Sequence, residues 1–393
     1  MSPLSHSWVR GRGAPHALDG RLTSTAPARI LRTFPISCLA ELSAAADSTS
    51  DDLVLDTLML PFASGALRWP DAGGALFLRA RAGAALRAAA GGGLVCEQSF
   101  KPWAAALSRA GYALTEAAPG PFPLVLLLPP RSREEARALL AQALQRVAPG
   151  GVVVASQANN EGARSGEADL ARLAGAVQSL SKHKCRVFWA TADAARMDAG
   201  LLAEWAALDA PRPITDGRSR FLSRPGLFAW SRIDAASALL ARCLPHDLAG
   251  RGADLGAGFG YLAAAVAGHC PGVTALDLYE AEARGLALAR RNLAEHAERI
   301  ALDFVWHDVT AGLLPERRYD FIVSNPPFHQ GRADQPEIGR AFLVAAAAGL
   351  RAGGRFWLVA NRHLPYEDVL RRNFRKVREV CAEQGFKVIE AVK

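Results

Sequence analysis

Short apolar runs alternate with longer amphipathic stretches from about residue 52 to the end of the chain. In the first half, runs of strand length occur at 74–80, 93–98, 123–130, 150–157 and 185–191. Between them, residues 102–112 and 133–151 have helical spacing, and the second helix is expected to end at the glycine pair 150–151. Because strands that alternate with helices build parallel sheets, the pattern predicts an α/β fold.

The second half of the chain repeats this pattern. Its apolar runs fall at 252–260, 273–280, 302–308, 319–327 and 354–361, with an amphipathic stretch over 281–297. The best internal match sets LLLPP, a helix and APGGVVVASQANNEG beside VSNPP, a helix and RAGGRFWLVANRHLP. Such a repeat indicates duplication, with Leu128 in the first copy where Asn325 stands in the second. The sequence therefore predicts two tandem Rossmann-like domains.

Length and local composition suggest where these domains begin and end. A chain of 393 residues suits two domains, at roughly 150 residues for each. Residues 209–228 are rich in Pro, Gly and Arg, as a linker would be, so the domains are expected over 51–215 and 216–393. Residues 1–50 carry five arginines and lack strong periodicity, and they are expected to be a disordered leader.

Charge and cysteine content restrict the class of protein. The net charge of +8 and the pI near 9.5 favour a polyanionic partner, although a generally basic surface explains them equally well. The six cysteines form no C-x-x-C pair and have no histidine at ligand spacing, so neither a metal site nor a disulfide framework is expected. No apolar run reaches the ~18 residues of a membrane span. We therefore expect a soluble, cytoplasmic, monomeric protein without metal.

A glycine-rich turn follows the first strand of the second half. The stretch ADLGAGFGYLAAAVAG places Asp254 at the strand end, Gly256, Gly258 and Gly260 in the turn, and a helix directly afterwards. Glycines let the backbone approach a ligand, and a helix N-terminus presents free N–H groups to an anion. The spacing is G-x-G-x-G, whereas the dinucleotide fingerprint is G-x-G-x-x-G. The turn therefore favours S-adenosylmethionine over NAD as the ligand.

Acidic residues also end the next two strands. Glu280 closes the strand 273–280, where a carboxylate can accept both hydroxyls of a ribose, and Asp277 competes with it for this role. Asp308 closes the strand 302–308, where it can accept from an adenine amino group, although a helix-capping aspartate is an equal alternative. Because parallel strands end at one edge of their sheet, the three acids predict a cofactor site there.

The fourth strand of the second half ends in Asn-Pro-Pro-Phe. Prolines fix φ and donate no hydrogen bond, so the carbonyls of Asn325 and Pro326 stay free to accept. If the Asn325 side-chain oxygen and the Pro326 carbonyl accept the two hydrogens of a planar amine, its lone pair can face an activated methyl group. Phe328 would stack on a flipped-out base, and His329 would contact the substrate, although a solvated loop explains His329 equally well. A rigid surface turn is the alternative.

Together these motifs resemble the class I methyltransferases that modify guanine N2 in ribosomal RNA, the RsmC and RlmG type. The resemblance covers roughly residues 60–393 and rests on DLGAGFG, SNPPFHQG, GRFWLVANRHLPYEDVL, VVVASQANNEGARS and RPGLFAWSRIDAASALL. It implies S-adenosylmethionine as the cofactor and ribosomal RNA or a ribosomal subunit as the partner. It also implies that the first domain is a decayed copy that no longer binds cofactor and that grips RNA or supports the second domain.

Two other classes of function stay open on the sequence alone. The Asn-Pro-Pro-Phe motif also serves adenine-N6 and protein glutamine-N5 methyltransferases, so the methyl acceptor is not settled by the motif. A non-catalytic RNA-binding assembly factor would need both copies to have decayed, and the retained acids and Asn325 argue against it.

Overall fold

The computed structural model describes residues 52–327, 329–330, 333–334 and 336–393, and the predicted leader at 1–50 lies outside the described residues. The first half contains the strands β1 (Ala75–Leu78), β2 (Leu94–Glu97), β3 (Ala113–Thr115), β4 (Phe122–Leu127), β5 (Val147–Ala158), β6 (Gln178–Lys182) and β7 (Cys185–Thr191). Its helices are α2 (Leu53–Leu58), α3 (Leu60–Ala63), α4 (Ala84–Ala89), α5 (Lys101–Arg109), α6 (Arg133–Arg146), α7 (Ala163–Ala174) and α8 (Ala199–Ala206).

The second half has a matching set of elements. Its main strands are β10 (Ala249–Leu255), β11 (Gly272–Glu280), β12 (Ala301–Trp306), β13 (Tyr319–Ser324), β16 (Leu350–Asn361), β17 (Lys376–Glu383) and β18 (Phe386–Val392). Its helices are α9 (Ala235–Cys243), α10 (Tyr261–His269), α11 (Ala283–Asn292), α12 (Pro336–Gly349) and α13 (Glu367–Asn373).

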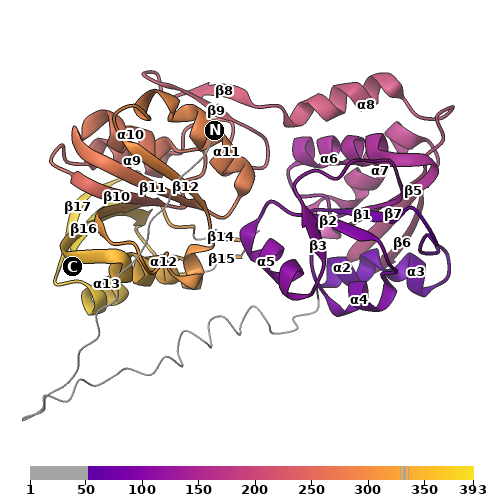
Figure 1. Cartoon of the computed structure of the whole chain (residues 1–393), viewed down its shortest axis with the longest axis horizontal. Coiled ribbons are helices and arrows are strands. Elements are labelled where there is room, and N and C mark those ends of the chain that lie inside the picture. The colour runs from indigo at the N-terminus through magenta and orange to yellow at the C-terminus, as the bar shows by residue number, and fades with distance from the viewer. Residues whose placement is uncertain (1–51, 328, 331–332, 335) are drawn as a thin grey trace, which may run out of the picture. The chain divides into compact units, whose positions relative to one another are not determined.

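Both halves arrange their strands in the same order. The first sheet runs β3-β2-β1-β4-β5-β7-β6 and the second runs β12-β11-β10-β13-β16-β18-β17 (Figure 1). In each sheet the first five strands are parallel, and the last two are added in antiparallel pairs. The predicted α/β fold with two Rossmann-like sheets is therefore confirmed, and each strand of one seven-stranded sheet has a counterpart in the other.

Helices cover both faces of the second sheet, which explains why its strands are apolar runs (Figure 1). On one face, Leu240 of α9 and Val266 of α10 join a buried cluster with Leu276 of β11. On the other face, Leu343 of α12 packs in a cluster with Ile322 of β13. None of the helices in the described ranges is long and apolar enough to cross a membrane.

The end of one helix differs from the prediction. The stretch 133–151 was expected to be helical as far as its glycine pair, but α6 ends at Arg146 and Val147 already has an extended backbone. Gly150, with φ of +76°, lies inside β5 where its pairing with β4 shifts register. The glycines therefore shape a strand and do not cap a helix.

The apolar pattern also failed to predict four strands, β3, β6, β17 and β18. Three of these, β3, β6 and β17, lie at sheet edges. All five residues of β6 are exposed, and β17 has the charged sequence KVREVCAE. Within the predicted linker, β8 (Arg212–Thr215) and β9 (Arg220–Ser223) form a hairpin, and the domain boundary near residue 215 stays a prediction.

A buried carboxylate connects the two halves. The Glu135 side chain on α6 is only 6% exposed, and its Oε1 lies 2.8 Å from a guanidinium nitrogen of Arg79 and 2.8 Å from one of Arg284. Gly226 has a positive φ of +88°, and a Cβ there would approach Glu135 Oε2 to 2.1 Å. The segment that leads into the second half therefore passes directly over this carboxylate.

Replacing Glu135 by alanine should lower the free energy of unfolding by about 3 kcal/mol, because two arginines lose the carboxylate that they share. Glu134→Ala is the matched control, since Glu134 pairs with Arg212 at 2.8 Å while both side chains are about 40% exposed. That control should cost less than about 1 kcal/mol. Urea denaturation of both variants checks the difference, and equal losses would contradict it.

Candidate active site

The glycine turn of the second half lies between β10 and α10. Gly256, Gly258 and Gly260 have φ values of +74°, +55° and +90°. A Cβ on Gly260 would lie 2.9 Å from Leu293 Cδ1, so this glycine lets α10 pack closely. A Cβ on Gly258 would meet no atom within 4 Å, so the backbone there borders open space that a ligand can approach.

Asp254 lies beneath this turn with one oxygen unused. The residue is 1% exposed, and its Oδ2 accepts a hydrogen bond from Ala263 N at 3.0 Å. Its Oδ1 is buried without a partner among the residues that the structure describes. Burial raises the pKa of Asp254 to about 7, and the nearby charge of Glu280 adds to this effect. A buried, half-satisfied carboxyl of this kind suits a cationic group of a ligand.

Glu280 stands at the end of β11, as predicted, and binds the glycine turn. Its Oε2 accepts from Gly258 N at 2.7 Å, and its Oε1 accepts from Glu282 N at 2.8 Å. Burial raises the pKa of this carboxyl. Each oxygen keeps a further lone pair, so the carboxylate can hold the turn and still accept from a ligand hydroxyl.

Asp277, the competing candidate on the same strand, has a different environment. It is fully buried and accepts from guanidinium nitrogens of Arg251 at 2.7 Å and Arg317 at 2.9 Å. The Tyr319 hydroxyl donates to it at 2.7 Å. The Asp277 carboxylate is thus already paired with these groups, whereas Glu280 contacts the glycine turn.

Asp308 is found at the end of β12 as a capping residue. Its Oδ1 accepts from Thr310 N at 2.9 Å and from Thr310 Oγ1 at 2.6 Å, at the start of the 3₁₀ helix Val309–Ala311. Its Oδ2 has no hydrogen bond within the described ranges. The capping geometry leaves this second oxygen available to an adenine amino group, so the predicted role is a proposal.

The loop directly after β11 is held by backbone of the first half. Lys101 N donates to Ala281 O at 2.8 Å, and Ala283 N donates to Ser99 O at 2.9 Å. The indole N–H of Trp306 lies 2.9 Å from Ser99 O and 2.8 Å from Ala281 O. The first half therefore fixes the segment that follows the strand-end carboxylate.

The Asn325 side chain is oriented by two hydrogen bonds. Its Nδ2 donates to Asp234 Oδ2 at 3.0 Å and to Ser237 Oγ at 2.9 Å. Neither Asn325 Oδ1 nor the Pro326 carbonyl accepts a hydrogen bond from any described residue. Among the described residues, these two acceptors at the end of β13 therefore have no donor, and their predicted role with an amine stays a proposal.

The predicted stacking residue Phe328 lies outside the described residues. The backbone of His329 belongs to the short strand β14 (His329–Gln330), which pairs antiparallel with β15 (Ala333–Asp334), but its side chain lies outside the described part. The predicted contacts of both residues with the substrate therefore stay predictions.

Asp234 and Ser237 were missed in the sequence, although they touch the central asparagine. The order Asp-x-x-Ser at a helix start is visible in IDAAS, and it predicts a cap for α9. The contact with Asn325, however, joins residues 91 positions apart. No local sequence pattern predicts a contact between residues so far apart in the chain.

In the first half, the corresponding sheet edge is occupied by ion pairs. Glu97 ends β2 as Glu280 ends β11, but its carboxylate binds the guanidinium of Arg146. Arg79, with a positive φ of +53°, follows β1 where the second half has its glycine turn. A cavity of about 540 Å³ at this edge is lined by charged residues of both halves, including Arg284.

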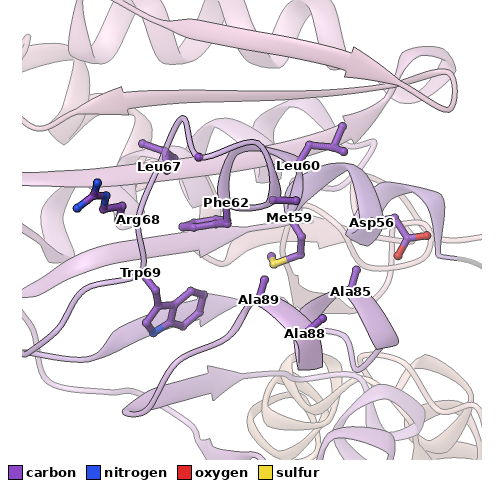
Figure 2. Close-up of a pocket in the computed structure, with 12 residues that line it drawn as sticks. Asp56, Met59, Leu60, Phe62, Leu67, Arg68, Trp69, Ala85, Ala88 and Ala89 are labelled. Carbon is purple, nitrogen blue, oxygen red and sulfur yellow. The ribbon is translucent and has the colours of Figure 1, made fainter.

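A second cavity, of about 500 Å³, lies on the first half and is mainly apolar. Figure 2 shows Met59, Phe62 and Trp69 around it, together with small residues of α4. No residue of the predicted motifs lines this cavity, so it does not belong to the candidate site.

Comparison with known proteins agrees with the geometry. A family model described as the methyltransferase small domain matches residues 218–390. The ribosomal RNA small subunit methyltransferase C of Pseudomonas paraeruginosa is 32% identical over 280 residues, which cover 70% of this chain and 81% of that protein. The ribosomal RNA large subunit methyltransferase G of Shewanella amazonensis is 30% identical over 256 residues, or 65% of each chain.

A solved structure agrees as well. The 16S rRNA N2 methyltransferase RsmC of T. thermophilus, in complex with AdoMet and guanosine, superposes with a TM-score of 0.75. Its sequence identity is 25%, and the match covers 88% of this chain and 93% of that chain.

The fold, the glycine turn and the strand-end acids define a class I methyltransferase that uses S-adenosylmethionine. Within that class, the chain belongs to the family of the ribosomal RNA small subunit methyltransferase C, as the sequence motifs predicted. The described residues fit this cofactor, because the unpaired Oδ1 of Asp254 can receive its ammonium group and Gly258 leaves room for its approach.

Cofactor affinity should therefore depend on pH near neutrality. With a pKa of about 7, the Asp254 carboxyl is charged above this pH and can pair with an ammonium group, but it becomes neutral below it. The Kd for S-adenosylmethionine should rise roughly tenfold between about pH 7.5 and about pH 6. Isothermal titration calorimetry measures it, with Asp254→Asn as a control that should bind weakly and depend less on pH than the wild type. An unchanged wild-type Kd would contradict the assignment.

Proposed function

We propose that the protein transfers a methyl group from S-adenosylmethionine to the exocyclic N2 amine of a guanine in ribosomal RNA. One observation carries this proposal: neither Asn325 Oδ1 nor the Pro326 carbonyl accepts a hydrogen bond from a described residue, and both lie at the sheet edge that also holds the glycine turn. The relatives named as ribosomal RNA methyltransferases, and the related structure solved with guanosine, support the choice of RNA and guanine.

The two acceptors orient and activate the amine. The N2 lone pair of guanine is delocalised into the ring, so the amine is a weak nucleophile. When Asn325 Oδ1 and the Pro326 carbonyl each accept one N–H, they stabilise the positive charge that develops on nitrogen and direct the lone pair towards the methyl donor. The stiff proline pair keeps both oxygens in place without cost at the moment of reaction. No general base is required during transfer.

The remaining site residues hold the cofactor, which supplies an electrophilic methyl group on its sulfonium. Asp254 pairs with its ammonium group, Glu280 accepts from its ribose hydroxyls, and Asp308 accepts from its adenine amine. Gly256, Gly258 and Gly260 let the backbone pass close beside it.

The substrate is recognised outside these contacts as well. A guanine within a helix must be flipped out to reach the acceptors. Phe328 then stacks on the extruded base, and His329 contacts the nucleotide.

The two domains have different roles. Residues 51–215 form a scaffold domain that also grips RNA, and residues 216–393 form the catalytic domain. The net charge of +8 and the backbone contacts of Ser99 and Lys101 support these roles. The protein acts as a monomer in the cytoplasm, where ribosomal subunits are assembled.

Incubation with labelled S-adenosylmethionine tests the function directly. The substrates are small subunits, large subunits, deproteinised ribosomal RNA and release factors, and nucleoside analysis identifies the methylated atom. Label on guanine N2 of ribosomal RNA is the expected result. Label on adenine or on a glutamine side chain, or no turnover despite cofactor binding, would overturn the proposal.

Replacing Asn325 by alanine should lower kcat by about 10²–10³, because one of the two acceptors is lost in the transition state. The Kd for S-adenosylmethionine should stay at the wild-type value, since the proposed contact of Asn325 is with the substrate amine and not with the cofactor. Asn373→Ala is the control: Asn373 Nδ2 donates to Val369 O at 2.8 Å on α13, which carries no proposed site residue. Equal loss of turnover and cofactor binding in the Asn325 variant would refute its role.

A further inference from the structure

We propose that Asp234 and Ser237 are positioning residues, which hold the Asn325 amide with its oxygen turned towards the substrate amine. The inference rests on the proposed function, because it assigns the orientation that the acceptor mechanism requires. Both contacts are short, with Asn325 Nδ2 at 3.0 Å from Asp234 Oδ2 and 2.9 Å from Ser237 Oγ.

The chemistry of the two partners decides which end of the amide faces the substrate. An ionised carboxylate only accepts hydrogen bonds, whereas an asparagine side chain carries one donor end and one acceptor end. Asn325 must therefore direct Nδ2 towards Asp234, and Oδ1, on the same carbon, is turned away from it. A flipped amide would place two oxygens together and would present an N–H group to an amine that has only hydrogens to offer.

Helix capping alone does not account for this contact. Asp234 Oδ2 does accept from Ser237 N at 2.8 Å and so caps α9. Asp198 caps α8 in the same way through Leu201 N at 2.8 Å, and no other side-chain bond to it occurs among the described residues. A capping aspartate is thus complete without an amide partner, and the bond to Asn325 is an additional feature.

The first half offers an internal comparison. Its helix α2 precedes the sheet as α9 does, and it packs on β5 and β7 where α9 packs on β16 and β18. Asp52 caps α2 through Leu55 N at 3.1 Å, at the positions that correspond to Asp234 and Ser237. The other oxygen of Asp52 is paired with Arg81 at 3.1 Å. Asp52 therefore caps its helix as Asp234 does, but its side chain pairs with an arginine and not with an asparagine.

The first half has apolar residues at the positions of both Asn325 and Ser237. Leu128 stands where Asn325 stands in the second half, and Leu55 stands where Ser237 stands. Both leucines are buried, with exposures of 2% and 0%. A serine at this helical position therefore accompanies the asparagine and is absent without it, as expected if the serine serves the amide and not the helix.

The fixed orientation also selects the class of substrate atom. An oxygen that faces the reacting group favours a nucleophile with N–H groups, such as an exocyclic amine. A ring nitrogen without a hydrogen, such as guanine N7, or a carbonyl oxygen offers nothing to Oδ1 and would leave it unpaired, which costs binding. Asp234 and Ser237 thereby make Asn325 specific for an amine.

Asp234→Asn tests the inference with little change in shape. Asparagine caps helices as well as aspartate does, so the melting temperature should stay unchanged. Because an asparagine at this position can donate as well as accept, the Asn325 amide is free to flip. We expect kcat on ribosomal RNA to fall roughly 10–100-fold, as for loss of a hydrogen bond to a charged group, with the Kd for S-adenosylmethionine unchanged. Asp198→Asn is the matched cap control and should retain wild-type kcat.

A charge-transposed pair supplies the readout that a structural role would not give. N325D alone faces the Asp234 carboxylate with a second acceptor and should be almost inactive. In the double variant D234N/N325D, the introduced amide donates to the introduced carboxylate, whose other oxygen again faces the amine. We expect the double variant to be at least about tenfold more active than N325D, because a bond to a charged group is restored.

These outcomes separate the two proposals. Label on a base other than guanine, or on protein, in the wild-type reaction refutes the proposed function whatever the variants do. With a methylating wild type, unchanged kcat in D234N, or parallel losses of kcat, cofactor affinity and melting temperature, refutes the positioning role. Absence of recovery in the double variant likewise refutes it.

Discussion

Two carboxyls lie beside a single glycine turn, the buried Asp254 and the partly buried Glu280, and desolvation raises the pKa of both. Removing them from water opposes their charge, and backbone N–H groups of Ala263 and Gly258 offset part of that cost. A positively charged ligand beside them would relieve the remainder. With the proposed cofactor contacts, affinity and the stability of this sheet edge are linked, because carboxyls that weaken the free protein would favour its complex.

The two halves differ in how the charged groups at this sheet edge are paired. In the first copy, Glu97 is paired with Arg146, and Arg79 follows the first strand where glycine would leave space. These charges are matched inside the protein and need no ligand. In the second copy, Asp254 Oδ1 is left without a partner among the described residues. The charged groups of the first edge are thus paired within the protein, whereas the second edge keeps a buried carboxyl oxygen that the proposed cofactor would pair.

Sequence patterns predicted those features of the fold and the site that depend on residues close together in the chain. The central strands are apolar runs because both faces are covered, and Asp254, Glu280 and Asn325 follow from their positions at strand ends. The exposed edge strands β6 and β17 lack such runs, so they were missed. Contacts such as Asn325 with Asp234 were also missed, since they join distant segments and leave no periodic signal.

The backbone pairing between residues 99–101 and residues 281–283 has an evolutionary consequence. Because these bonds are made by peptide groups, side-chain substitutions other than proline leave the donors and acceptors in place, and the first half supplies partners to the loop after β11. Loss of the first half would leave the Ala283 N–H without its carbonyl partner, close to the strand-end Glu280. A descendant sequence that lost the first half would need a substitute for this backbone support, which favours the retention of both halves.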